Sequence, residues 1–224
     1  MVMKILLIWV SCLMGLQSAA HAGPWPREEG HTFIAAGGNF LLSDGAELPV
    51  HYDPTLYVEY GLRPDLTVGL DFYSADKGRI YSAFSFAAIP ANSPDADLKS
   101  MLSFGIGYRR NADDSEELLT RIGLSLGQST PNGWLAFDGN ITYDAIDQAF
   151  RPKADFTWGR SWSDRWTTTL QVQTGQGFSD DHYAKVSPTL IYTINERYRV
   201  NLGSVHALTG DRGSALKIET WLQF

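Results

Sequence analysis

Residues 190–202 read LIYTINERYRVNL. Apolar and polar residues alternate on both sides of the polar triplet Asn195-Glu196-Arg197. Alternation with a period of two is typical of a β-strand that has one apolar and one polar face. The triplet is short enough for a tight turn, and Tyr192 and Tyr198 stand beside it. The stretch therefore predicts a β-hairpin whose turn is flanked by aromatic side chains.

The same unit occurs twice more, within residues 55–72 and 155–172. Its turns are Arg63-Pro64-Asp65 and Ser163-Asp164-Arg165. In membrane-spanning barrels, short turns lie on the periplasmic side and aromatic residues gather at the bilayer interface. We therefore expect an aromatic girdle beside the periplasmic turns, formed by Tyr60, Trp158, Trp166, Tyr192 and Tyr198.

Segments of about ten residues with this alternation follow one another from residue 31 onward. They predict an all-β fold, a closed antiparallel up-and-down transmembrane β-barrel of about twelve strands over residues 31–224. The barrel must be closed, because an open sheet edge would leave unpaired backbone groups in lipid. A ten-stranded barrel is the alternative, since residues 89–97 and 127–133 are long for periplasmic turns. The expected strands start near residues 31, 54, 66, 79, 98, 116, 133, 150, 165, 183, 197 and 213.

The N-terminal residues predict a secretory signal peptide over residues 1–22. Lys4 supplies a basic start, residues 5–16 form an apolar run, and Ala20-His21-Ala22 is a small-x-small cleavage site. The apolar run is shorter than the roughly 20 residues of a spanning helix, so a membrane anchor is the weaker alternative. Residues 23–30 are then expected to be a short periplasmic leader ahead of the barrel.

The C-terminal residues KIETWLQF resemble the assembly motif of outer-membrane β-barrel proteins of Gram-negative bacteria. Lys217, Leu222 and Phe224 match that motif, whereas Glu219 stands where the motif prefers Gly. The resemblance implies location in the cell outer membrane, with Leu222 and Phe224 as the signal that the barrel-assembly machinery recognises. Segments 23–26, 59–62 and 67–70 are similar to those of uncharacterised small proteobacterial barrels.

Composition narrows the function classes. The chain has 25 acidic and 18 basic residues, for a net charge of −7. Nucleic-acid binding is excluded, because contact with phosphates needs a basic face. The one cysteine, Cys12, lies in the expected signal peptide, which excludes disulfides and cysteine-ligated metals from the barrel. The expected partners are the lipid bilayer and lipopolysaccharide. A soluble β-sandwich also has alternating strands, but it needs neither an aromatic girdle nor a terminal Phe.

Alternation also predicts which charged side chains point inward. The residues expected to line the lumen are Glu59, Asp71, Arg121, Asp138, Lys153, Asp155, Lys185, Arg199, Lys217 and Glu219. In one interpretation, acidic and basic walls face each other across a narrow aqueous channel and orient small polar solutes. In the other, the same side chains pair across the barrel and fill it. The sequence leaves both interpretations open.

We therefore predict a narrow porin-like channel for small polar solutes, and the balance of inward charges favours neutral or zwitterionic ones. The alternative is a structural or surface-exposed barrel that is filled by its own side chains and transports nothing. The longest external connection, residues 41–53, is too short for an elaborate binding domain, which favours transport. We expect no enzymatic activity.

Two histidine motifs make a barrel hydrolase the third alternative. Asp180-Asp181-His182 resembles the Asp-x-His pair of omptin proteases, but the facing pair of acids has no equivalent here. Ser204-Val205-His206 puts a hydroxyl and an imidazole on one outward face, as outer-membrane lipid hydrolases do. The order of its residues is reversed and no orienting acid is evident. His31 and His51 stand alone, so we predict no metal site and no cofactor.

Overall fold

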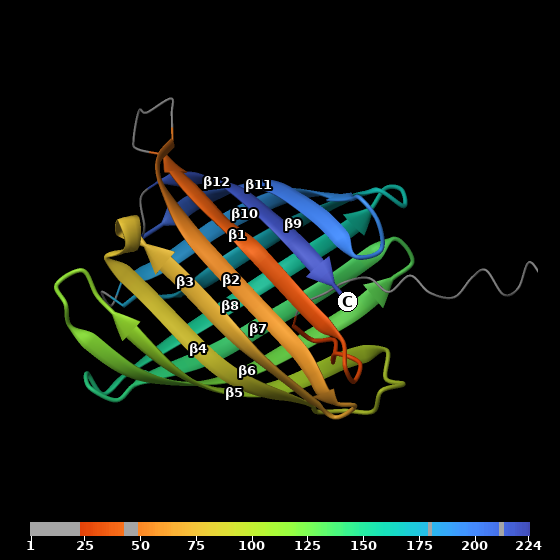
Figure 1. Cartoon of the computed structure of the whole chain (residues 1–224), viewed down its shortest axis with the longest axis horizontal. Coiled ribbons are helices and arrows are strands. Elements are labelled where there is room, and N and C mark those ends of the chain that lie inside the picture. The colour runs from red at the N-terminus through yellow and green to blue at the C-terminus, as the bar shows by residue number, and fades with distance from the viewer. Residues whose placement is uncertain (1–22, 43–48, 179–180, 211–212) are drawn as a thin grey trace, which may run out of the picture.

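The computed structural model describes residues 23–42, 49–178, 181–210 and 213–224, so the predicted signal peptide lies outside the described residues. The described chain is a closed antiparallel barrel in which β1 pairs with both β2 and β12 (Figure 1). The predicted up-and-down barrel is confirmed, with twelve strands and not ten. A short 3-10 helix, Asp76–Gly78, separates β3 from β4. The strands are β1 Thr32–Leu42, β2 Pro49–Arg63, β3 Leu66–Ala75, β4 Ile80–Pro90, β5 Leu98–Arg110, β6 Glu116–Thr130, β7 Gly133–Asp144, β8 Ala149–Ser161, β9 Trp166–Gln176, β10 His182–Thr193, β11 Tyr198–Thr209 and β12 Ser214–Gln223.

Two predicted boundaries were wrong. β2 starts at Pro49 and not near residue 54, because its ladder with β1 continues past a register shift until Leu42 pairs with Pro49. Residues 127–133 contain no long turn, because β6 runs to Thr130 and only Pro131 and Asn132 precede β7. Elsewhere the predicted starts agree with the structure to within one residue. In the described part of the chain, no helix is long and apolar enough to cross a membrane.

The seam between β1 and β12 closes the barrel. Ten residue pairs join the two strands, from Phe33 with Gln223 to Leu42 with Ser214. Beyond them, the Thr32 N–H donates to the Phe224 carbonyl at 2.7 Å, and the Phe224 N–H donates to the Thr32 carbonyl at 3.1 Å. The C-terminal residue thus completes the ladder, and no strand edge is left open.

Both barrel ends can be assigned from the turns. Two-residue turns connect β2 to β3 and β6 to β7 at the end of the barrel where the C-terminus lies. Since outer-membrane barrels keep short turns on the periplasmic side, we name this the periplasmic end and the opposite one the external end.

The outer face of the barrel is apolar. Trp158, Trp166 and Tyr198, near periplasmic turns, have 44, 44 and 47% of their surface exposed, and the rings of Trp166 and Tyr192 lie 4.7 Å apart. This band and its aromatic rim are what a membrane-spanning barrel presents to lipid. Large apolar side chains exposed along the strands include Leu70, Phe104, Ile106, Ile122, Ile141, Phe156, Leu170, Leu190, Leu202 and Ile218.

Inward glycines make room for aromatic rings on neighbouring strands. A Cβ on Gly69 would lie 2.3 Å from the ring of Phe86, and a Cβ on Gly107 would lie 2.5 Å from the ring of Phe84. The two phenylalanine rings therefore lie against backbone that only glycine leaves bare. This packing fills the wall of the lumen beside β3, β4 and β5.

Candidate functional site

The lumen contains a cavity of about 400 Å³. Residues from all twelve strands line it, and so does Gly23, which precedes the barrel. Eight of the ten residues predicted for the lumen lie on its wall: Glu59, Asp71, Arg121, Asp138, Lys153, Asp155, Lys217 and Glu219. Lys185 and Arg199 share the inward parity of Ser187 and Asn201 but do not line this cavity. The Lys185 ammonium lies 5.3 Å from the centre of the Tyr183 ring.

The charged residues of the lumen form local pairs. Lys153 Nζ lies 2.9 Å from Asp155 on the same strand, and Lys217 Nζ lies 3.7 Å from Glu219. Such i,i+2 neighbours share one face of a strand. Arg121 reaches from β6 to Asp71 on β3 at 2.9 Å. The three basic residues on the cavity wall thus each lie beside an acid, which favours the interpretation in which the inward charges pair with one another.

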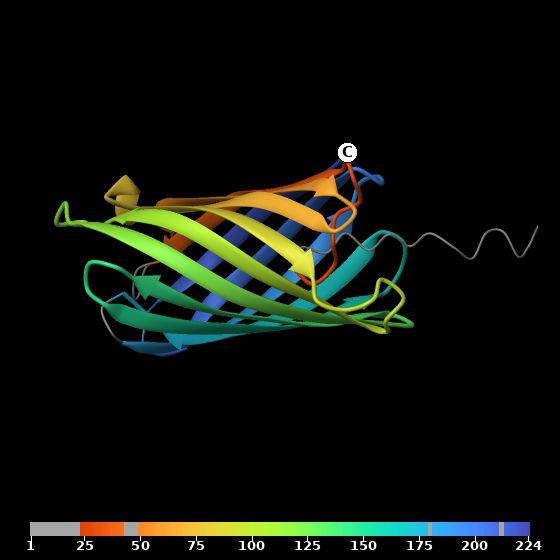
Figure 2. The same ribbon diagram turned by 90° about the horizontal axis from the view of Figure 1, so that it is seen from below.

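The segment before β1 enters the periplasmic end of the barrel. Figures 1 and 2 show it in red at the same end as the C-terminus. Pro24 is fully buried and packs on Gly127 of β6, where a Cβ would lie 2.4 Å from Pro24 Cγ and 2.8 Å from the indole of Trp25. The leader that the sequence placed in the periplasm thus has its first residues inside the lumen. We call residues 23–27 the plug segment.

Arg27 fixes the plug segment to the wall. Its Nε donates to Glu59 Oε2 at 2.6 Å, and the exposed fractions of the two side chains are only 10 and 5%. Its backbone N–H donates to Thr67 Oγ1 at 3.1 Å, and its guanidinium lies 4.5 Å from the centre of the Phe33 ring. The Tyr57 hydroxyl donates to the other oxygen of Glu59 at 2.7 Å. A buried carboxylate thus receives one charged and one neutral hydrogen bond.

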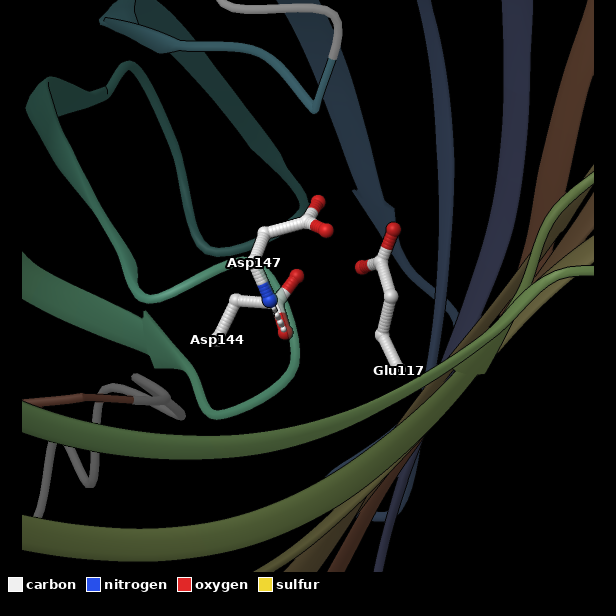
Figure 3. Close-up of side chains that lie close together, drawn as sticks. All are labelled: Glu117, Asp144 and Asp147. Atoms are coloured by element: carbon white, nitrogen blue, oxygen red, sulfur yellow. Dashed lines mark hydrogen bonds between the residues drawn. The ribbon is translucent and has the colours of Figure 1, made fainter.

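A second group of interacting side chains lies at the external end. Phe178, which follows β9, lies between two guanidinium groups, 3.9 Å from Arg109 and 4.8 Å from Arg151. These arginines belong to an external cluster with three acids, and Figure 3 shows the three carboxylates pointing toward one another. The acids are Glu117, Asp144 and Asp147, whose nearest oxygens lie within 4.8 Å of one another.

The external cluster is held by its own cations. Arg151 lies 3.2 Å from Asp144 and 3.5 Å from Asp147, and Arg109 lies 3.9 Å from Glu117. Carboxylates at this spacing are a donor set for a divalent ion. Two guanidinium groups already offset most of the charge of the three acids, so the arrangement is a salt-bridge network at the external end of β5 to β8. Alternation extended to the strand ends would have found Arg109, Glu117, Asp144 and Arg151, whereas nothing in the sequence pattern marked Asp147, Phe178 or Arg27.

The two hydrolase motifs differ in what the structure shows. Asp180 lies outside the described residues. The histidine ion pairs within the described ranges involve His31 and His51, so His182 has no carboxylate partner there. His206 is hydrogen bonded at both ring nitrogens, to Ser204 Oγ at 3.0 Å and to Ser214 Oγ at 2.9 Å. These three hydrogen-bonded side chains, Ser204, His206 and Ser214, lie on the outer face near the external end, away from the cavity.

No protein-family model matches the sequence, and no curated protein matches it. Solved structures do match. KdgM porin has a TM-score of 0.60 and 8% identity, and the match covers 87% of this chain and 99% of the porin. The same porin in complex with disordered oligogalacturonate gives 0.59 and 9%, with the same coverage. An outer membrane channel from Pseudomonas putida F1 gives 0.54 and 9%, covering 94% of this chain and 100% of that one.

The fold is that of the outer-membrane β-barrels. At these identities the likeness concerns the fold, so the function has to be argued from the lumen and its two mouths.

Proposed function

We propose that this chain is a narrow outer-membrane channel for small polar solutes, closed at rest by its plug segment and its external cluster. The cavity of about 400 Å³ between the two closures carries the proposal, because a barrel filled by its own side chains would leave no such space. The plug segment is not part of the barrel wall. Its withdrawal would open the periplasmic mouth without breaking any strand pairing.

The charges of the cavity indicate which solutes fit. Five acidic and three basic side chains line it, so anions meet no excess of positive charge. The oligogalacturonate bound to one structural neighbour is an anion. Such a ligand does not suit this lumen, and neutral, zwitterionic or cationic solutes do.

Single-channel recording in planar bilayers tests the proposal. The parent protein should show rare openings, and a variant that lacks residues 23–27 should conduct steadily, with a mean conductance at least tenfold higher. A synthetic GPWPR peptide added from the periplasmic side should block the deletion variant, whereas a scrambled peptide of the same composition should not.

A structural barrel without transport is the second candidate, supported by the closure of both mouths. It predicts background conductance from the parent and from the deletion variant alike, in protein whose folding is verified by its mobility on unheated gels. That result would replace the channel proposal.

A lipid hydrolase is the third candidate, and the Ser204–His206–Ser214 chain is its specific observation. A serine in the orienting position stabilises a protonated imidazole less than the carboxylate of a Ser-His-Asp triad does. We therefore propose that the chain has no hydrolytic activity. A fluorophosphonate probe should not label the folded protein; labelling that is lost in Ser204→Ala would establish the hydrolase instead.

A further inference from the structure

One acid of the cavity lacks a cation partner. Within the described residues, Asp138 forms no salt bridge; Ser125 forms a hydrogen bond with it, and Lys153 acts on it electrostatically from beyond salt-bridge distance. The other four acids that line the cavity each have a partner: Glu59 with Arg27, Asp71 with Arg121, Asp155 with Lys153 and Glu219 with Lys217. A carboxylate without a salt bridge in a confined lumen is costly, because the charge of Lys153, shared with Asp155, offsets its desolvation only in part.

Asp138 also stands beside a second acid. Asp138 on β7 and Asp155 on β8 are directly paired across the ladder. Asp155 is 91% buried, since only 9% of its surface is exposed, and its Oδ1 has no hydrogen-bond partner among the described residues. Lys153 binds the other oxygen of Asp155 and offsets one of the two charges. The pair therefore keeps a net charge of −1, and Asp155 Oδ1 is a buried acceptor without a hydrogen-bond partner among the described residues.

The first residue of the plug segment lies against this pair. A Cβ on Gly23 would be 2.7 Å from Asp138 Oδ1, and Gly23 has a φ of +99°, so a side chain there would be both obstructed and strained. Each backbone bond is about 1.5 Å long, so the Gly23 nitrogen lies within about 6 Å of that oxygen. Cleavage after Ala22, as the sequence predicts, would turn this nitrogen into an α-ammonium group.

We propose that Asp138, together with Asp155, is a binding site for a primary ammonium group inside the lumen. The α-ammonium of Gly23 fills the site when processing leaves Gly23 as the first residue, and the ammonium of a small solute fills it when the plug segment is absent. An ammonium group has three N–H donors, and the Asp138 carboxylate on the cavity wall offers acceptor oxygens to them, while Asp155 adds negative charge beside it. A single positive charge balances the net −1 of the pair with Lys153, whereas a divalent ion would leave an excess. The proposal does not depend on conduction.

The chemical reactivity of the Gly23 amine tests whether its α-ammonium group occupies the site. Protein isolated from outer membranes is identified at its N-terminus by intact mass and treated with acetic anhydride at neutral pH, and acetylation of Gly23 is followed by peptide mass spectrometry. The Gly23 amine should react at least tenfold more slowly in the parent than in Asp138→Asn. The matched control Glu219→Gln removes an acid that Lys217 already partners on β12, and it should leave the rate unchanged. Equal rates in the parent and in Asp138→Asn would overturn this half of the proposal.

Binding of n-butylammonium tests whether the site accepts the ammonium group of a small solute. If the isolated protein starts at a residue other than Gly23, this experiment alone tests the site. Calorimetry should detect binding to the variant that lacks residues 23–27, and the same deletion with Asp138→Asn should show at least a tenfold weaker association. Binding that is absent from both, or equal in both, would overturn the site. If Asp138→Asn does not fold, Asp138→Ser provides the same two readouts. Neither assay measures conductance. The ammonium site can therefore be disproved while the channel proposal holds, and the channel proposal can be disproved while the ammonium site holds.

Discussion

Replacement of Arg27 by Ala is the most direct perturbation of the periplasmic closure. Arg27 and Glu59 are almost fully buried and only 2.6 Å apart, so the substitution leaves a carboxylate in the lumen without its cation. Breaking a buried pair in this way costs about 3–5 kcal/mol. Each 1.4 kcal/mol is a factor of about ten in an equilibrium constant. We therefore expect the ratio of docked to undocked plug segment to fall by two orders of magnitude or more.

The assay is the open probability of single channels, recorded at equal protein density for the parent and for Arg27→Ala. A large rise is expected, and Glu59→Gln should produce a similar rise because it removes the other half of the pair. The double variant should open little more than either single one, since both changes remove the same interaction. Arg63→Ala is the matched control, because Arg63 pairs with Asp65 in a nearby periplasmic turn where both side chains are mostly exposed.

An unchanged open probability in Arg27→Ala, with the plug segment released, would contradict the role of this ion pair in closing the pore. Release can be followed independently by the rate at which a protease cleaves the N-terminal residues of the folded barrel. Rapid cleavage with unchanged conductance would mean that residues 23–27 do not close the pore.

Three further outcomes follow from the packing. Gly69→Ala should destabilise the barrel by about 1–3 kcal/mol in urea unfolding, because its Cβ would lie 2.3 Å from the Phe86 ring, and Phe86→Ala in the same chain should relieve part of that loss. Phe178→Ala should raise the conductance of the protein that lacks residues 23–27 if, as we propose, the ring between Arg109 and Arg151 narrows the external mouth. Phe224→Ala should lower the amount of folded protein in the outer membrane several-fold, and an equal yield on refolding in detergent would assign that loss to assembly.

The barrel wall could be predicted because its physical rule is local. A strand between lipid and lumen has to alternate between apolar and polar residues, and a turn at the bilayer edge has to be short and polar. The hairpin at Asn195-Glu196-Arg197 can therefore be recognised from its own residues. The same alternation correctly predicts that Asp71 and Arg121 point inward. It does not say that these two meet across the lumen from β3 and β6, because that contact depends on how strongly the wall curves.

The plug segment could not be predicted by the same rule. Residues 23–27 have no period, and Pro24 and Pro26 only exclude regular strand and helix. Their position is decided by two distant features of the wall, the bare backbone at Gly127 and the carboxylate of Glu59. Neither is recognisable as a docking site until the barrel has closed around it.

Closure and selectivity are coupled in this lumen, because the plug segment brings in positive charge. While it is docked, Arg27 offsets Glu59. When it leaves, five acidic and three basic residues remain on the cavity wall, and the net charge becomes −2. Charge in a narrow pore attracts counter-ions strongly, so the open channel should prefer cations over anions. The reversal potential of the variant that lacks residues 23–27, measured across a KCl gradient, should therefore lie on the cation-selective side. It should move toward zero in Glu59→Gln on the same background, and an anion-selective reversal potential would contradict the assignment of these acids to the conducting path.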